Sequence, residues 1–210
     1  MLILPNFNWI EDDGGDRSNP ETRTYINGKW KALIASVRTM APELKLTVDY
    51  HVERTEYDWY SDLDYLGDKW WVDVSGSGGS AATTAEMHAA ASDKLTTYYL
   101  PISQRFGNKP FLFAEIGYYS ADTAAQHTYN VYSSEIGDFN AANAAVLSDW
   151  DEQARAYEAV LYAFAETPWV QGAYSFGYAY FDFDSKGYSI RSKTAEGILK
   201  QIYGEINAAP

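Results

Sequence analysis

The sequence predicts an α/β fold in which parallel strands are covered on the outside by helices. Segments with the composition of strands alternate with segments of helical period, and this alternation is typical of a parallel sheet. The apolar run at residues 109–118 has the length and the bounding turn residues of a strand buried on both faces. With 210 residues and a hydrophobic fraction of 46%, the chain suits one domain with a sizeable core.

In the first part of the chain, three strands and one helix are predicted. Residues 1–7 form a short strand that Pro5 confines to an edge or a strand end. Residues 44–50 and 63–74 form the next two strands. A helix before residue 42, a proline, is indicated by apolar residues at helical spacing, namely Trp30, Leu33, Ile34 and Val37.

A long helix and a long loop surround the apolar run. Residues 81–105 are rich in Ala, Leu and Tyr and are predicted to form a helix that ends before the strand at 109–118. The polar stretch at residues 118–146 shows no clear period. A loop of that length inside a compact domain is usually functional.

The last part of the chain is predicted to be helix, strand and helix. Ser148, with Asp151 three residues later, can cap the first of these helices. Its apolar face comprises Trp150, Ala154, Tyr157, Leu161 and Phe164. Residues 170–183 form an aromatic strand, and residues 193–206 form the closing helix.

The number of strands limits the architecture. A closed eight-stranded barrel takes about 250 residues, whereas about five strands are visible here. The predicted fold is therefore a partial (β/α)8 barrel, or TIM barrel, of about five βα units. No linker divides the chain, so residues 1–210 are expected to form a single domain.

Charge and hydropathy exclude several classes of partner. The formal net charge of −13 repels phosphate backbones, so nucleic acid is not expected as a partner. The sequence has no apolar run of 18 residues, so no membrane span is expected. The N-terminus lacks the basic region and apolar core of a signal peptide, which predicts a cytoplasmic protein unless a leader was removed.

No metal or cofactor is expected. The chain has no cysteine, and its three histidines lie in unrelated segments without metal-ligand spacing. The glycine-rich stretch at residues 75–80 carries no lysine, unlike a loop that cradles phosphate.

One carboxylate and many aromatic rings remain to be explained. Glu115 stands at the C-terminal end of the apolar run, where barrel enzymes place their catalytic groups. An unpaired acid is costly there unless it is used, and the competing interpretation is a strand-end acid paired with a core Arg or Lys. Aromatic residues make up 16% of the chain. Several lie in polar loops, where exposed ring faces suit the apolar side of a sugar ring.

At this point the chain resembles the clan A glycoside hydrolases, the (β/α)8-barrel cellulases and β-mannanases. The segment KPFLFAEIGYYS at residues 109–120 resembles their strand seven. Other blocks agree in order: residues 29–38 resemble the helix after strand four, 63–67 strand six, 151–157 helix seven, 170–176 strand eight, and 189–195 the start of the last helix. The resemblance covers the barrel from about strand four onward.

The resemblance implies a retaining glycoside hydrolase that cleaves a β-1,4-linked polysaccharide, either cellulose or another glucan, or mannan. Glu115 would be the nucleophile, with a second carboxyl about 5–5.5 Å away as the acid/base. In the family the acid/base glutamate ends strand four, usually after an asparagine. Such a pair is missing here, and Glu11 is the nearest glutamate, with Asp12 and Asp13 as weaker alternatives.

Substrate-binding residues are expected around Glu115. Trp59 and Tyr60 are candidates for outer sugar subsites, and Tyr118 or its neighbour Tyr119 is expected to reach the cleft. Of the pair Trp70 and Trp71, one is expected to face the core. The full predicted set is His51, Trp70, Trp71, Tyr118, Phe176 and Tyr178.

Two alternatives stay open at the level of the sequence. The first is a non-catalytic carbohydrate-binding or structural remnant of a glycosidase barrel, favoured by the missing acid/base pair. The second concerns assembly: a partial barrel has open strand edges, which invite pairing. The chain is therefore expected to form a homo-oligomer or to pair with a separate fragment that supplies strands one to three.

Overall fold

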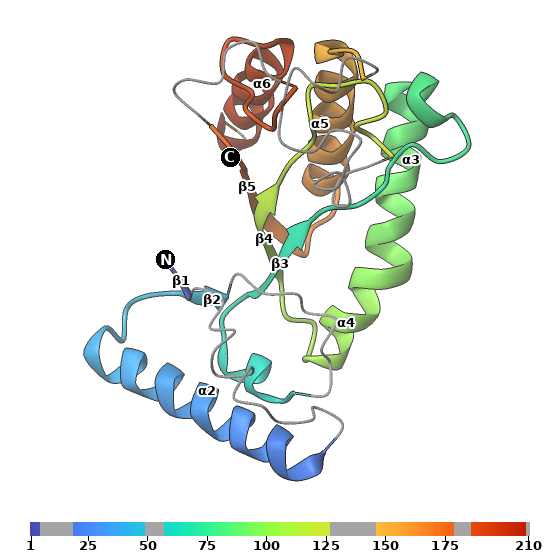
Figure 1. Cartoon of the computed structure of the whole chain (residues 1–210). Helices are drawn as coiled ribbons and strands as arrows, with labels where there is room; N and C mark the ends of the chain where they lie inside the picture. Colours follow the sequence, from blue (N-terminus) through green and yellow to red (C-terminus); the bar gives the residue numbers. More distant parts are fainter. Residues whose placement is uncertain (5–18, 49–56, 127–145, 179–185, 209–210) are drawn as a thin grey trace.

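The structure is a computed structural model that describes residues 1–4, 19–48, 57–126, 146–178 and 186–208 (Figure 1). In this part of the chain, strands and helices follow one another in the predicted order. All strand pairings are parallel. None of the described helices has the length and hydropathy needed to cross a membrane.

The strands form two parallel pieces of sheet that meet side by side. One piece contains β1 (Leu2–Leu4) and β2 (Leu46–Val48), and the other has the order β3 (Leu66–Trp70), β4 (Phe111–Ile116), β5 (Val170–Ser175). The carbonyl of Leu46 on β2 accepts hydrogen bonds from the backbone N–H groups of Asp64 and Tyr65, just before β3. The strands thus run in chain order from β1 to β5, as in part of a (β/α)8 barrel.

Gly67 allows this close approach of β2 and β3. A Cβ atom at this position would lie 1.6 Å from the carbonyl oxygen of Val48, which is backbone and cannot turn away. Only a residue without a side chain therefore fits between the two pieces of sheet.

Helix α2 (Pro20–Met40) has the predicted apolar face. Asn19 accepts a hydrogen bond from the N–H of Glu21 and caps the helix. Trp30 stacks on Trp59 with ring centroids 4.4 Å apart, and Trp59 stacks in turn on Tyr60. Trp59 and Tyr60 belong to the short helix η1 (Trp59–Asp62) and are fully buried. The prediction that these two rings serve outer sugar subsites is therefore wrong.

The predicted long helix at 81–105 is present in three consecutive parts: α3 (Thr84–Lys94), the π-helical turn η3 (Leu95–Tyr99) and α4 (Leu100–Arg105). Thr83 and Glu86 form a capping box at its start. Pro101 explains the wide turn, because it has no N–H for the carbonyl of Thr97 and its ring needs extra room there.

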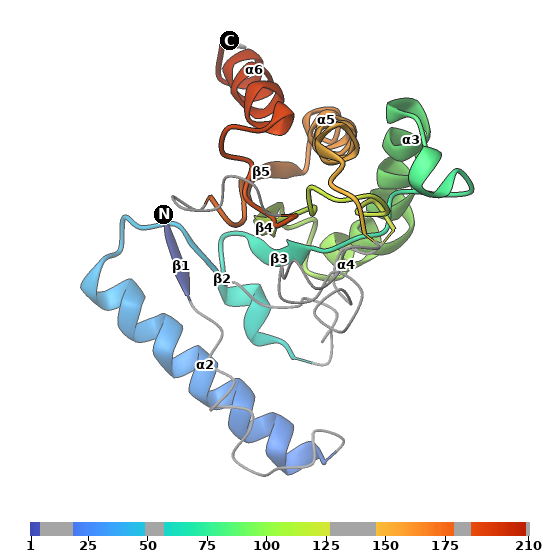
Figure 2. The ribbon, with the colours of Figure 1, turned by 45° about the horizontal axis from the view of Figure 1, so that its top comes forward.

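Helices α5 (Trp150–Ala165) and α6 (Thr194–Ala208) complete the outer layer. Helix α5 packs against both α3 and α6, and Figures 1 and 2 show α5 between these two helices. The cap of α5 is Asp149, which accepts hydrogen bonds from the N–H groups of Asp151 and Glu152. The cap was predicted at Ser148, one residue too early.

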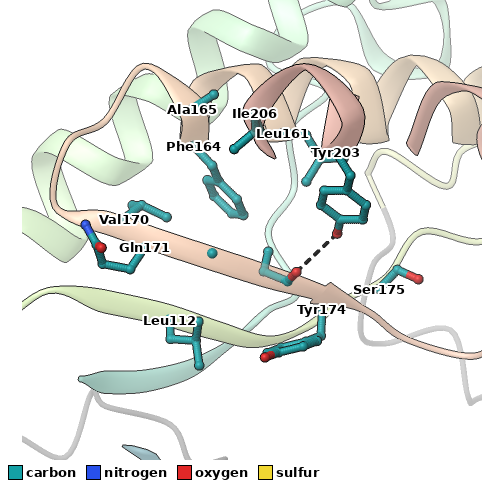
Figure 3. A pocket seen from close by; sticks show the side chains of 12 residues that line it. Leu112, Leu161, Phe164, Ala165, Val170, Gln171, Tyr174, Ser175, Tyr203 and Ile206 are labelled. Carbon is teal, nitrogen blue, oxygen red and sulfur yellow. Dashed lines mark hydrogen bonds between the residues drawn. The ribbon is translucent and has the colours of Figure 1, made fainter. Parts of the chain in front are cut away.

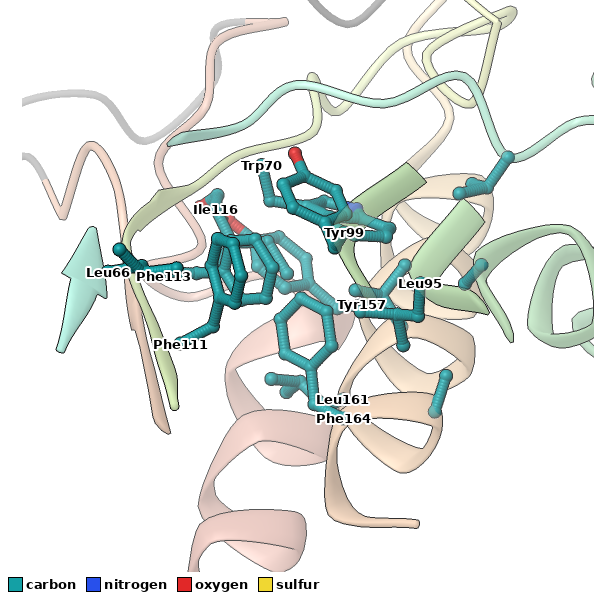
Figure 4. Packing of buried hydrophobic residues seen from close by; sticks show 14 of the residues in the cluster. Leu66, Trp70, Leu95, Tyr99, Phe111, Phe113, Ile116, Tyr157, Leu161 and Phe164 are labelled. Carbon is teal, nitrogen blue, oxygen red and sulfur yellow. Dashed lines mark hydrogen bonds between the residues drawn. The ribbon is translucent and has the colours of Figure 1, made fainter. Parts of the chain in front are cut away.

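The core between the sheet and this layer is built from rings (Figure 4). Phe113 on β4 stacks on Phe164 of α5, with ring centroids 4.5 Å apart, and Trp70 meets both rings edge to face. Tyr99 closes the cluster from the π-helical turn. Trp70, Phe113 and their neighbour Ile116 therefore all point toward the helices.

The segment after β4 is held by a buried acid. The carboxylate of Glu152 accepts hydrogen bonds of 2.9 Å from the backbone N–H groups of Thr123 and Ala125. Carboxylate oxygens of Asp122, Asp149 and Glu152 lie within 4.8 Å of one another. Both oxygens of Glu152 accept from the backbone, so this carboxylate fixes the segment that follows β4.

Replacing Gly67 is expected to open the junction of β2 and β3. Gly67→Ala should lower the free energy of unfolding by about 3 kcal/mol or more, because the added carbon has nowhere to go. Gly28→Ala is the control: Gly28 lies in α2 with open space around it, and this change should stabilise the protein by about 0.5–1 kcal/mol. Chemical denaturation measures both. Equal effects of the two substitutions would contradict this account of the junction.

The stability of the protein should depend on pH through Glu152. Burial raises the pKa of this carboxyl from 4.5 to about 7, against the opposing effect of its two backbone hydrogen bonds; Asp149 and Asp122 raise it further. The folded protein thus binds a proton that the unfolded chain has already lost. The free energy of unfolding should fall by roughly 3 kcal/mol as the pH rises from about 4.5 to about 7. This part of the pH dependence should disappear in Glu152→Gln; a pH profile identical to that of the native chain would count against it.

Candidate functional site

The candidate site lies at the carboxyl ends of β3, β4 and β5, on the sheet face away from the helices. Lys69 and Glu115 are paired in the register of β3 and β4, and Trp70 and Ile116 are the next pair. Side chains alternate along a strand. A register shift between Asp68 and Lys69 leaves Ala114 of β4 without a partner, and this bulge explains why Phe113 and Ile116 point to the same face although they are three residues apart. Because Trp70 and Ile116 point into the helix-side core, Lys69 and Glu115 point to the opposite face, which is the interior of a complete barrel.

Lys69 and Glu115 form an ion pair. The Nζ atom of Lys69 donates a hydrogen bond of 2.9 Å to Oε1 of Glu115, and each side chain keeps about a fifth of its surface exposed (22% and 19%). Within the described part of the chain, no hydrogen bond to Oε2 of Glu115 is present. The carboxylate is therefore held at one oxygen and available at the other. The competing interpretation was an acid at the strand end paired with an Arg or Lys of the core. It is met in part: the partner is a lysine, but the ion pair is partly exposed and does not lie in the core.

Trp71 forms an aromatic wall at the same ends of the strands. Its ring lies against the backbone of Gly117, where a Cβ atom would come within 2.6 Å of the ring. Phe176, which follows β5, and Tyr188 both meet the Trp71 ring edge to face, with centroids 5.4 and 5.0 Å away. Trp71 and Phe176 are only partly buried. Trp71, Phe176 and Tyr188 together are called the aromatic wall below.

Tyr178 lies beyond the aromatic wall and is the most exposed of the predicted residues, with 59% of its surface accessible. Its hydroxyl lies 3.3 Å from a carboxylate oxygen of Glu196 on α6 and donates a hydrogen bond to it. The ring is thus tethered at its polar end while its faces stay open to solvent.

Trp70 and Tyr118 do not belong to the site. Both are fully buried, and Nε1 of Trp70 donates a hydrogen bond of 2.9 Å to the hydroxyl of Tyr118. Burial raises the pKa of the Tyr118 phenol well above its usual value, and the hydroxyl donates to the carbonyl of Val72. Tyr119 is buried as well, stacked on Tyr188. The structure thus corrects the prediction that Trp70, and one of the two tyrosines after Gly117, face the cleft.

Two predicted site residues, Glu11 and His51, lie outside the described residues. The same applies to Asp12 and Asp13. Their roles as acid/base and substrate ligand stay predictions.

Sequence reasoning missed Lys69 and Tyr188. The signal for Lys69 was present: a buried strand that carries one basic residue beside a core tryptophan must turn that residue to the other face. Tyr188 had no comparable signal, because it lies in irregular structure and reaches the aromatic wall only through the tertiary fold.

Comparisons with solved structures show the fold. A family 113 β-1,4-mannanase has a TM-score of 0.62 at 20% sequence identity, over 85% of this chain and 51% of its own. The family 113 β-mannanase of Alicyclobacillus acidocaldarius has a TM-score of 0.61 at 18% identity, over 85% and 50%. A β-glucuronidase of Ruminococcus gnavus has a TM-score of 0.53 at 15% identity, over 85% and 29%.

The chain spans about half the length of the two mannanases, which agrees with a partial barrel. No curated protein matches it. The sequence profile described as Glycoside Hydrolase Family 113 matches residues 20–202, which contain β2 to β5, Glu115 and the aromatic wall. The chain therefore belongs to glycoside hydrolase family 113.

Proposed function

We propose that this chain carries the nucleophile half of a retaining glycoside hydrolase that cleaves β-1,4-linked mannan. The observation that supports it most is the position of Glu115: a carboxylate at the end of a central parallel strand, held at one oxygen by Lys69 and partly exposed. Family membership and the activity of the two solved mannanases favour mannan over glucan as the substrate.

In this mechanism, Glu115 attacks the anomeric carbon of the sugar through its unbonded oxygen. A covalent glycosyl-enzyme forms, and the bond to the leaving sugar breaks as a second carboxyl protonates the glycosidic oxygen. Water then attacks the same carbon and releases Glu115, with the second carboxyl acting as base. We assign that second carboxyl to Glu11.

Lys69 and the aromatic wall have supporting roles. The ammonium of Lys69 stabilises the negative charge of Glu115 before attack and fixes the direction of the carboxylate. The partly exposed faces of Trp71 and Phe176 offer apolar surface to the sugar ring, and Tyr178 extends that surface outward.

A second candidate function is carbohydrate binding without turnover. The ion pair of Glu115 with Lys69 favours it, because an acid with a structural partner needs no catalytic use. Binding of manno-oligosaccharides by the native chain, with no release of reducing ends, would select this alternative.

Glu115→Gln is expected to abolish hydrolysis. The amide keeps the shape of the side chain but cannot form the covalent intermediate, so the release of reducing ends from soluble mannan should fall on the order of 10³-fold or more. Binding of a manno-oligosaccharide, followed by tryptophan fluorescence, should persist. Glu43→Gln is the matched control, because Glu43 is an exposed acid before β2, at the other end of the strands. Unchanged hydrolysis in Glu115→Gln would remove this residue from the mechanism.

Lys69→Met and Lys69→Arg separate charge from packing. Methionine keeps the apolar stem of the side chain without the ammonium, so kcat should fall by about tenfold or more. Arginine restores the cation, and Lys69→Arg should recover part of the lost rate. Steady-state kinetics on the same mannan measures both. Equal rates in the methionine and arginine variants would show that the charge of Lys69 has no role in turnover.

A further inference from the structure

Tyr188 is the central ring of the aromatic wall. It meets the rings of Trp71 and Phe176 edge to face, and it stacks on Tyr119 with ring centroids 3.8 Å apart. A Cβ atom at Gly177 would lie 2.9 Å from the Cβ of Tyr188, so the chain after β5 also packs closely on this residue. The main chain of Tyr188 therefore determines where the rings of the wall meet.

A buried side chain of α5 holds the main chain of Tyr188. Tyr188 lies in a bend and not in a strand, so no sheet ladder fixes it. Gln153 is fully buried, and its Nε2 atom donates hydrogen bonds of 2.8 Å to the carbonyl of Tyr118 and of 3.3 Å to the carbonyl of Tyr188. One amide group thus bridges the segment that follows Glu115 and the segment that carries the wall.

A second link joins the same two segments. The carbonyl of Gly187 accepts hydrogen bonds from the backbone N–H of Ser120 at 3.1 Å and from its hydroxyl at 3.0 Å. Lys193 is buried, and its Nζ atom donates to the hydroxyl of Ser120 at 2.8 Å and to the carbonyl of Gly187 at 3.4 Å. Gln153, Ser120 and Lys193 are together called the buried clamp below.

The N–H groups of Gln153 carry its role in the structure. Within the described chain, its Oε1 atom has no hydrogen-bond partner, and an unpaired buried acceptor lowers stability. An apolar side chain would fill the same space without this cost. The two carbonyls that the amide binds both flank the candidate site, and they are the contacts that an apolar side chain could not make.

We propose that Gln153 is a positioning residue for sugar binding, which holds the aromatic wall against the strand end that carries Glu115 without touching the substrate. The inference rests on the proposed function, because it takes the wall to be the surface that binds the sugar. Gln153 acts through Tyr188, whose ring lies beside that of Trp71. Since the wall contacts the sugar in the ground state and the transition state alike, loosening it should weaken binding and leave the chemical step unchanged.

Gln153→Met tests this, because methionine fills similar space and has no N–H group to donate. KM for soluble mannan should rise by about fivefold, whereas kcat should stay within about twofold of the native value. Tyr203→Phe is the control. The hydroxyl of Tyr203 on α6 donates a hydrogen bond of 3.1 Å to the carbonyl of Ala173, in the groove beside β5 (Figure 3). This variant also removes one hydrogen bond from an outer helix to a main-chain carbonyl, and it should change neither constant.

The ring of Trp71 provides a measurement that does not depend on activity. In protein labelled with fluorotryptophan, the fluorine NMR resonance of Trp71 is assigned by its loss in Trp71→Phe. It should shift or broaden in Gln153→Met and stay in place in Tyr203→Phe. Circular dichroism checks folding. Should Gln153→Met fail to fold, Ser120→Ala, which removes one oxygen atom of the buried clamp, decides the test with the same expected changes.

An unchanged Trp71 resonance in Gln153→Met would overturn the proposal. A lower free energy of unfolding with KM at its native value would do so too, because this is the result of a purely structural role. A fall in kcat alone would place the effect at Glu115 and would also overturn it. If the native chain does not hydrolyse mannan, the proposed catalysis fails separately. The affinity for mannohexaose then replaces KM, and Gln153→Met should weaken it by about fivefold.

Discussion

The alternation of side chains on two neighbouring parallel strands is the constraint on which this structure depends. On β3 and β4, Trp70 and Ile116 point to the helices, and one residue earlier Lys69 and Glu115 point the other way. The aromatic core determines which face of the sheet is covered by the helices, because large rings such as Phe113 and Phe164 pack closely together on that face. A carboxylate is thereby held, on a rigid support, at a position where it stays partly exposed. The chemistry of the site is a consequence of the packing behind it.

Much of the fold follows from local patterns in the sequence. The apolar face of α2, the capping box of α3 and the buried run of β4 are all decided by residues close together in the chain, so the sequence predicts them well. The cap of α5 is harder to predict, because Ser148 and Asp149 are adjacent and both are favoured cap residues. The backbone conformation of the segment that leads into the helix makes Asp149 the cap.

The site is harder to predict, because exposure depends on neighbours that are distant in sequence. Glu115 is predicted as a site residue from its place at a strand end, and the structure places it near the carboxyl end of β4. Trp59, Trp70 and Tyr118 are residue types that often bind sugars, but all three are buried here. Trp59 stacks on Trp30, whereas Trp70 and Tyr118 meet Phe164 and Tyr157 edge to face. An aromatic side chain suits a core and a binding surface equally well. Residue type alone therefore cannot separate the two uses.

Gly117 lets the Trp71 ring of the aromatic wall pack directly on the backbone. The Trp71 ring lies where the β-carbon of any other residue at position 117 would be. The main chain of Gly117 therefore limits how closely the ring packs beside the strand end that carries Glu115. Phe176 and Tyr178 are partly or largely exposed and can change in size, whereas any side chain at position 117 would displace the Trp71 ring and with it the contacts of the aromatic wall.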